Sequence, residues 1–309
     1  MVNSKVVAVV LGAWLAACLP RVIGPASAVT VTSVGEAVAS LPESIQPAPA
    51  PRGRAYLFRG ALGPIFSRGM DRLTTELQQA GIEADVYEFT ICRLIAAHAI
   101  TVYRENPAPI ILIGHSMGGY CSIIFSQMLE AEKIPVSLVV TIDPAHVTPD
   151  VPLNVERFMN IFLSKDVLGG GDVKPAPGYR GHYASFDLSQ HDEVSHITID
   201  KMDDVHRQLI AKIVQLATTP PQSDGEAVPL RYVVPPNTAI ELWDSGTAVL
   251  VRKDDTLQTI ALNFHVPVWS LTQVNRRGDT TRLAQGERII IPRHLLPLTA
   301  MSGGPSVRR

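Results

Sequence analysis

One turn sequence constrains the fold of this 309-residue chain more than any other feature. Gly114-His115-Ser116-Met117-Gly118-Gly119 follows an apolar run at 109–113 and precedes an apolar helical pattern at 120–129. A G-x-S-x-G motif between a strand and a helix holds its serine in a strained turn, with the hydroxyl raised above the end of the strand. Glycines at the flanking positions relieve the crowding that side chains would cause there. Ser116 is therefore the candidate nucleophile, and the backbone N–H of Met117 is a candidate donor to an oxyanion.

Strands and helices alternate along the chain on both sides of this turn. Elements that alternate in this way form a mostly parallel sheet with helices on both faces, so the sequence predicts an α/β fold. The last helix has one apolar face, because its apolar residues recur at helical spacing. Strands are expected at 54–60, 84–89, 110–114, 136–142 and 158–163, and helices at 70–79, 94–104, 117–130 and 201–216.

A serine hydroxyl is a weak nucleophile, so a base and an acid are expected elsewhere in the chain. In an open α/β sheet the functional groups gather at the carboxyl ends of the strands. His196, which lies just before the last helix, is the candidate base. Asp143 and Asp166 each follow a strand and compete as the acid, and the better-defined strand and turn favour Asp143. The other histidines considered are His146, His182, His191 and His206, with His115 expected to shape the pocket.

The second oxyanion donor is expected after the first strand, where Arg59 to Gly63 offers the backbone N–H of Ala61 or Leu62. With these residues, positions 54–217 resemble the α/β-hydrolase superfamily, and within it the small bacterial lipases and esterases. The resemblance implies a serine esterase that acts through an acyl-enzyme, without a metal or organic cofactor. The turn at Asp143 resembles the acid turn of the pancreatic-lipase group, whereas Asp166 resembles the acid position of minimal bacterial lipases. The acid therefore remains open between the two.

A second, smaller unit is expected near the C-terminus. A strand opens at Val249, two short helical patterns follow, and a second strand spans 288–292. Over 248–294 this βααβ pattern resembles a LysM domain, a family that binds N-acetylglucosamine-containing glycans such as peptidoglycan or chitin. Asp254 stands where the family usually has a glycine before Asp-Thr-Leu, so the opening turn differs from the family pattern. The resemblance implies Asp255, Thr256 and Asn275 as glycan-binding residues.

The remaining segments are read from their composition. Residues 1–28 have the order of an export signal, processed either before Cys18 as a lipidated lipoprotein or after Ala26-Ser27-Ala28, unless the apolar stretch stays as an uncleaved membrane helix. Each of these alternatives places the body outside the cytoplasm, in the periplasm or cell envelope or secreted. A Pro-rich spacer is expected at 29–53, a linker at 218–247 and a tail at 295–309.

The charge and the cysteines limit the possible partners and cross-links. The formal net charge of −2 gives no excess of positive charge for binding nucleic acid. Cys92 and Cys121 are read as two buried thiols, with a disulfide as the alternative in an oxidising compartment.

The sequence as a whole predicts an exported serine hydrolase that is anchored to cell-wall glycan. The alternative is a catalytically inactive, glycan-binding protein of the cell envelope that keeps the hydrolase fold.

Overall fold

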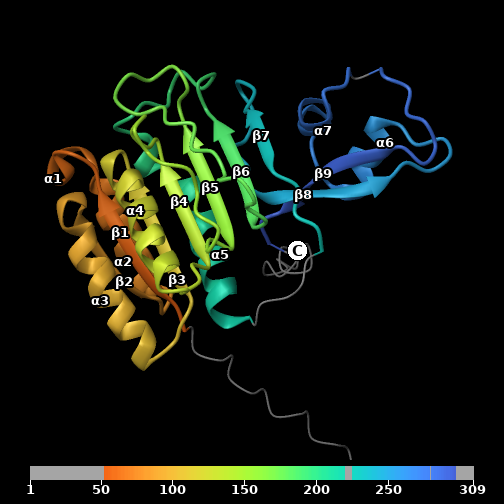
Figure 1. The fold of residues 1–309 in the computed structure, drawn as a ribbon. Helices are drawn as coiled ribbons and strands as arrows, with labels where there is room; N and C mark the ends of the chain where they lie inside the picture. The colour runs from red at the N-terminus through yellow and green to blue at the C-terminus, as the bar shows by residue number, and fades with distance from the viewer. Residues whose placement is uncertain (1–51, 220–224, 279, 297–309) are drawn as a thin grey trace, which may run out of the picture. The chain divides into compact units, whose positions relative to one another are not determined.

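Seven strands pair in the order β2-β1-β3-β4-β5-β6-β7, and every neighbouring pair is parallel (Figure 1). The computed structural model describes residues 52–219, 225–278 and 280–296, all within one compact unit that spans 48–309. The strands of this sheet are β1 (Arg54–Arg59), β2 (Glu83–Glu88), β3 (Ile110–His115), β4 (Leu138–Ile142), β5 (Arg157–Phe162), β6 (His182–Asp187) and β7 (Leu230–Val233).

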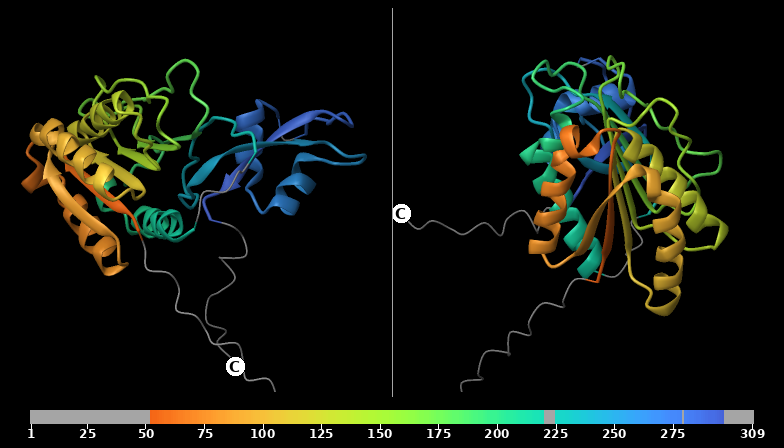
Figure 2. Two further views of the ribbon diagram at one scale, coloured as in Figure 1. Left: turned by 60° about the horizontal axis from the view of Figure 1, so that its bottom comes forward. Right: turned by 90° about the vertical axis from the view of Figure 1, so that its left-hand side faces the viewer.

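Helices cover both faces of the sheet (Figure 2). Apolar side chains of α2 (Arg68–Gln79) and α5 (Asp203–Thr218) form the core on one face, and those of α3 (Cys92–Glu105) and α4 (Met117–Ala131) form the core on the other. The α/β fold with helices on both faces is therefore confirmed. The short helices of this region are α1 (Gly63–Phe66), η1 (Phe89–Ile91) and η2 (Ile199–Lys201).

The first strand shows why these residues form a doubly covered sheet. Ala55 and Leu57 point into one core, and Tyr56 and Phe58 point into the other. Successive side chains of a strand alternate between faces, so a strand buried on both sides must be apolar throughout. The expected strands and helices up to residue 218 all occur, with ends that differ by a few residues.

Two strands of the sheet were not expected from the sequence. Strand β6 contains Ser185 in its interior, where the side chain contacts Asn160 of β5, so it lacks the continuous apolar run of a buried strand. Strand β7 is only four residues long, with Leu230 and Tyr232 buried and Arg231 exposed. It lies inside the stretch 218–247 that was expected as a linker, so the sheet continues beyond the expected boundary.

The C-terminal unit has the expected order of strand, two helices and strand. Its strands β8 (Trp243–Leu250) and β9 (Arg288–His294) are antiparallel, and α6 (Leu257–Phe264) and α7 (Val268–Asn275) lie between them in the chain. Strand β8 begins several residues before the expected start of this unit. Its first residues, Trp243 to Ser245, are buried.

A buried acid links β8 to the large sheet. Oδ2 of Asp244 lies 3.3 Å from Nε of Arg157 in β5, 3.1 Å from Nδ1 of His182 in β6 and 3.4 Å from Nζ of Lys212 in α5. Burial alone would raise the pKa of Asp244, but the hydrogen bond from His182 and the charges of Lys212 and Arg157 outweigh it and hold the pKa well below its usual range. The start of β8 is therefore fixed by charged contacts to three elements of the sheet layer.

Several sequence expectations lie outside the described residues. These are the export segment 1–28 with Cys18, nearly all of the spacer 29–53, and all but the first two residues of the tail 295–309. Within the described part of the chain, no helix combines the length and apolar character needed to cross a membrane. Cys92 and Cys121 are both buried and free.

Candidate active site

Ser116 occupies a strained turn between β3 and α4. Its backbone has φ 56° and ψ −122°, a conformation that side-chain-bearing residues rarely adopt. The turn is held by hydrogen bonds: the Ser116 N–H donates to the carbonyl of Ile142, and the Gly119 N–H donates to the carbonyl of Ser116. A Cβ on Gly118 would lie 2.1 Å from the carbonyl oxygen of Phe58, so the helix can start this close to β1 only with a glycine there. The expected nucleophile therefore has the backbone of a nucleophile elbow.

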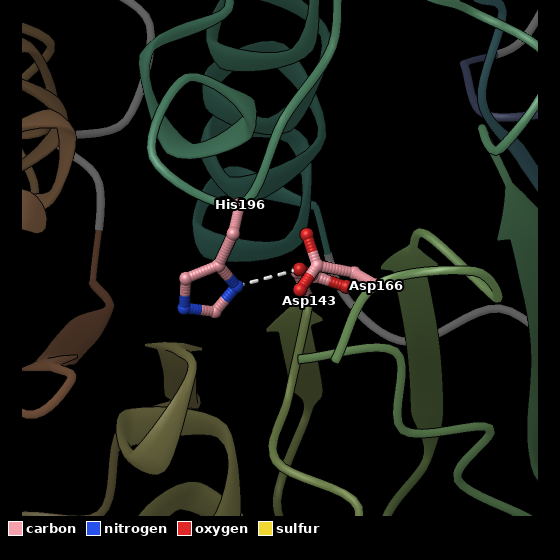
Figure 3. A group of neighbouring side chains, drawn as sticks. All are labelled: Asp143, Asp166 and His196. Atoms are coloured by element: carbon pink, nitrogen blue, oxygen red, sulfur yellow. Dashed lines mark hydrogen bonds and ion pairs between the residues drawn. The ribbon is translucent and has the colours of Figure 1, made fainter. Parts of the chain in front are cut away.

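His196 and Asp143 meet at the carboxyl edge of the sheet. Nδ1 of His196 lies 2.6 Å from Oδ2 of Asp143, as the dashed line in Figure 3 marks. The Asp143 carboxylate is fully buried, and its other oxygen accepts the backbone N–H of Leu163 at 3.0 Å and that of Gly170 at 2.8 Å. An imidazole that donates Nδ1–H to this carboxylate keeps Nε2 free to accept a proton. Within the described residues no hydrogen bond joins Ser116 to His196, and such bonds are often long in unliganded sites.

Asp166 lies beside the same pair but makes different contacts. The side chains of Asp143, Asp166 and His196 each place one ligand atom within 4.8 Å of the others (Figure 3). Oδ1 of Asp166 accepts the backbone N–H groups of Leu168 and Gly169, which shapes the loop after β5. The two candidate acids are therefore neighbours, and Asp143 is the one in hydrogen-bond contact with His196.

The loop after Asp166 encloses the Asp143 carboxylate. A Cβ on Gly169 would lie 2.3 Å from Oδ2 of Asp143, and Gly170 has φ +80°. A side chain at either position would clash or be strained. Sequence reasoning missed this function of the glycines, although the run Gly169-Gly170-Gly171 directly after Asp166 is a visible signal.

His115 connects the loops on either side of the serine. Nε2 of His115 lies 2.8 Å from the carbonyl oxygen of His196, so this nitrogen carries the proton and donates. Nδ1 then accepts from the Ser67 hydroxyl at 2.8 Å, and the Ser67 oxygen accepts the Gly60 N–H at 3.1 Å. The chain of bonds fixes the loop after β1 and the loop that carries His196. The sequence indicated that His115 shapes the pocket but offered no signal for Ser67.

Burial keeps His115 neutral. Desolvation, and next the charge of nearby His196, lower the pKa of His115 to about 4. The two imidazole rings lie 4.7 Å apart between centroids. When His196 takes up a proton, the neutral His115 places no second positive charge beside it. The imidazolium of His196 therefore meets no repulsion from His115.

The loop after β1 passes directly over the nucleophile. A Cβ on Gly60 would lie 2.6 Å from the Cβ of Ser116. The Gly60 N–H is already bound to Ser67, so the next backbone N–H groups, of Ala61 and Leu62, remain the candidates for the second oxyanion donor. On the other side, Met117 is the first residue of α4.

Three of the competing histidines have other partners, and the fourth is exposed beside the loop that encloses Asp143. His182 begins β6 and contacts Asp244, and His206 lies within α5 against Glu76. His191 is buried and contacts Glu193. His146, just after the Asp143 turn, is exposed.

In the C-terminal unit, the residues implied as glycan-binding also hold the fold. Asp254 has φ +67°, so an aspartate takes the backbone conformation for which a glycine is the usual choice. Oδ2 of Asp255 accepts the Arg252 N–H, and the Thr256 side chain caps the start of α6. The Asn275 amide bonds the backbone of Leu271 and of Ile290 in β9. Their role in glycan binding stays a prediction.

Comparisons with known proteins bear on both parts of the chain. The family model of the LysM domain matches residues 249–292. No curated protein matches the chain. Among solved structures, it is similar to the esterase domain of a Rhodothermus marinus protein, with 15% identity and a TM-score of 0.38 over 54% of this chain and 87% of that one. It is also similar to the NocB thioesterase domain from the nocardicin cluster, with 16% identity and a TM-score of 0.29 over 61% and 85%.

The parallel seven-stranded sheet, with helices on both faces and Ser116 in the turn after β3, has the α/β-hydrolase-like arrangement. Residues 249–292 are a LysM domain, and the sheet that precedes them has an α/β-hydrolase-like fold.

Proposed function

We propose that this protein is a serine hydrolase that cleaves esters through an acyl-enzyme on Ser116. The observation that carries the proposal is the 2.6 Å contact between His196 and a fully buried Asp143, at the same sheet edge as a serine with φ 56°. A strained serine, an oriented imidazole and a buried carboxylate are the parts that such chemistry needs.

The reaction would proceed in two halves. Nε2 of His196 takes the Ser116 proton as the hydroxyl oxygen attacks the ester carbonyl, and the negative carboxylate of Asp143 stabilises the imidazolium. The backbone N–H groups of Met117 and of Ala61 or Leu62 would receive the oxyanion. His196 then gives its proton to the departing alcohol, which leaves an acyl group on Ser116. Water attacks this acyl group with His196 again acting as the base, so Ser116 is regenerated and the acid is released.

We propose further that the LysM domain retains the enzyme on glycan. LysM domains imply binding to peptidoglycan or chitin and a place outside the cytoplasm. The export signal in residues 1–28, with lipidation at Cys18 as one processing route, fits this location. A glycan-binding protein without turnover is the alternative, and no observation at the site favours it over the enzyme.

Hydrolysis of a soluble p-nitrophenyl ester tests the enzyme directly. Ser116→Ala should lower kcat by several orders of magnitude, because loss of the nucleophile removes the covalent route. Ser164→Ala is the matched control, since this exposed serine also follows a strand of the sheet and should leave kcat unchanged. Residual activity of Ser116→Ala within about tenfold of the parent would show that another group carries the reaction.

A further inference from the structure

Two loops beside Ser116 are each expected to supply part of the reaction. Residues 60–69, here called the donor loop, run from the end of β1 into α2 and contain the candidates for the second oxyanion donor. Residues 195–201, here called the base loop, carry His196 and end with η2. The two loops lie far apart in the sequence, so only tertiary contacts can hold them in one arrangement.

A buried aspartate forms the first link between these loops. Oδ2 of Asp200 accepts the backbone N–H of Gly69 at 2.9 Å, and Asp200 is fully buried. A Cβ on Gly69 would lie 1.8 Å from the carbonyl oxygen of Asp200, so the base loop rests directly on the start of α2. Only a glycine permits two backbones to approach this closely.

The neighbouring lysine forms the second link. Nζ of Lys201 donates to the carbonyl oxygen of Phe66 in the donor loop at 3.1 Å, and also to that of Ile197 in the base loop. Nζ lies 3.6 Å from Oδ1 of Asp200. In the opposite direction, the guanidinium of Arg72 in α2 donates to the backbone carbonyl of Lys201 at 2.7 Å. One ammonium group therefore binds the backbone of both loops, and its charge makes these hydrogen bonds stronger than neutral ones.

The bonds of His115 form the third link, which runs from the carbonyl of His196 to the N–H of Gly60. The donor loop is thus tied to the base loop at its first residue, at Phe66 and at its last residue. His115 is buried, whereas the side chain of Lys201 is 38% exposed. Lys201 is therefore the link that a substitution can remove without opening a cavity in the core.

We propose that Lys201 is a positioning residue of the reaction. Its ammonium group holds the donor loop and the base loop in one arrangement, so that the oxyanion donors and Nε2 of His196 face the same ester carbonyl. The catalytic part of this inference rests on the proposed function, whereas the linkage of the two loops does not. Positioning is needed most in the transition state, where a displacement of about 1 Å can lower the rate about 100-fold.

Kinetics with p-nitrophenyl acetate test the catalytic part. In Lys201→Met the side chain keeps its apolar length but loses its hydrogen-bond donors, so kcat should fall about 10-fold to 100-fold. KM should stay within about twofold of the parent, because the interaction lost is not with the substrate. Lys201→Arg still donates to two carbonyls and should restore kcat to within about threefold of the parent.

A matched control removes the same charge from the same edge of the sheet. Lys165 is exposed and follows β5, so Lys165→Met should leave kcat unchanged. A kcat of Lys201→Met equal to that of the parent would overturn the positioning role and leave the serine hydrolase intact. A rise in KM without a fall in kcat would overturn it as well, since this is the mark of lost substrate binding.

Hydrogen exchange measures the linkage of the loops without turnover. In a Ser116→Ala background, Lys201→Met should speed the exchange of backbone amides in the donor loop at least about tenfold, although the substitution lies in the base loop. Lys165→Met should leave exchange in the donor loop unchanged. Faster exchange confined to the base loop, or an equal effect of Lys165→Met, would overturn the linkage.

The two measurements together separate this inference from the proposed function. A parent that hydrolyses no ester, with a donor loop that exchanges faster in Lys201→Met, would refute the serine hydrolase and support the linkage. A parent that hydrolyses the ester, with exchange in the donor loop unaffected by Lys201→Met, would support the serine hydrolase and refute the linkage.

Discussion

At the scale of single residues, the site depends on which carboxylate orients His196. Both Asp143 and Asp166 lie beside the imidazole, but their hydrogen bonds differ. Asp143 binds Nδ1 of His196 and is itself held by two backbone N–H groups, whereas Asp166 uses one oxygen to hold its own loop. We therefore expect the carboxylate of Asp143 to orient His196 and to stabilise its imidazolium.

This difference predicts unequal effects of two otherwise identical substitutions. Asp143→Asn should lower kcat on a soluble ester by about 10⁴, because an amide in place of the carboxylate favours the wrong imidazole tautomer. Asp166→Asn keeps an oxygen that can accept the loop N–H groups and should cost less than about tenfold. Steady-state kinetics at neutral pH measure both variants. The reverse ranking would make Asp166 the acid and show that the observed contact of Asp143 is structural.

At the scale of elements, hydrophobic periodicity predicted the strands that bury a continuous apolar run and the helices that bury one apolar face. Strands β3 and β4 and helix α5 are of this kind. Strand β6 was not predicted because Ser185, which takes part in a buried polar contact, interrupts its apolar run. Strand β7 was not predicted because it is short and lies among proline and polar residues. The candidate site was also predicted only in part, because local patterns place single residues but not their tertiary contacts. Positions after predicted strands located Ser116 and Asp143, and a position just before the last helix located His196. Contacts such as that of Ser67 with His115 depend on tertiary structure that no local pattern encodes.

The junction of β8 with the sheet layer gives a prediction at this scale. Asp244→Asn removes the acid from a buried group of Arg157, His182 and Lys212, and should lower the free energy of unfolding by about 3–5 kcal/mol. Urea unfolding at neutral pH measures this loss. Glu226→Gln is the control, because Glu226 pairs with Arg288 at the surface, where such pairs contribute less than about 1 kcal/mol.

The loss should depend on pH in a definite direction. The folded state holds the pKa of Asp244 below its unfolded value of about 4, so its contribution is fully present above that pH and disappears as the pH falls toward the folded pKa. The difference between parent and Asp244→Asn should therefore shrink below about pH 4. A difference that is small at neutral pH, or that grows in acid, would contradict the assigned role of Asp244.

At the scale of the whole molecule, a LysM domain and a hydrolase-like sheet share one chain. We expect the LysM domain to hold the protein on insoluble glycan while the site remains open to soluble esters. Retention raises the local concentration of wall-associated substrate without a new contact at Ser116, so kcat on a soluble ester should not change.

Sedimentation with insoluble peptidoglycan measures this retention. The full chain should sediment with peptidoglycan and return to the supernatant when soluble N-acetylglucosamine oligomers are added. Hydrolysis of a soluble ester should be the same in both fractions. Sedimentation that the oligomers do not reverse would show that the LysM domain does not hold the protein through N-acetylglucosamine.

The central claim is that Ser116 is an activated nucleophile, and covalent labelling with a fluorophosphonate measures this most directly. An activated serine attacks the phosphorus and expels fluoride, so the intact mass of the parent should rise by one phosphonyl group, located on the peptide that contains Ser116. Ser116→Ala should not be labelled, and His196→Gln should be labelled orders of magnitude more slowly, because the base is missing. A parent protein that stays unmodified, or a label on another residue that persists in Ser116→Ala, would contradict the claim.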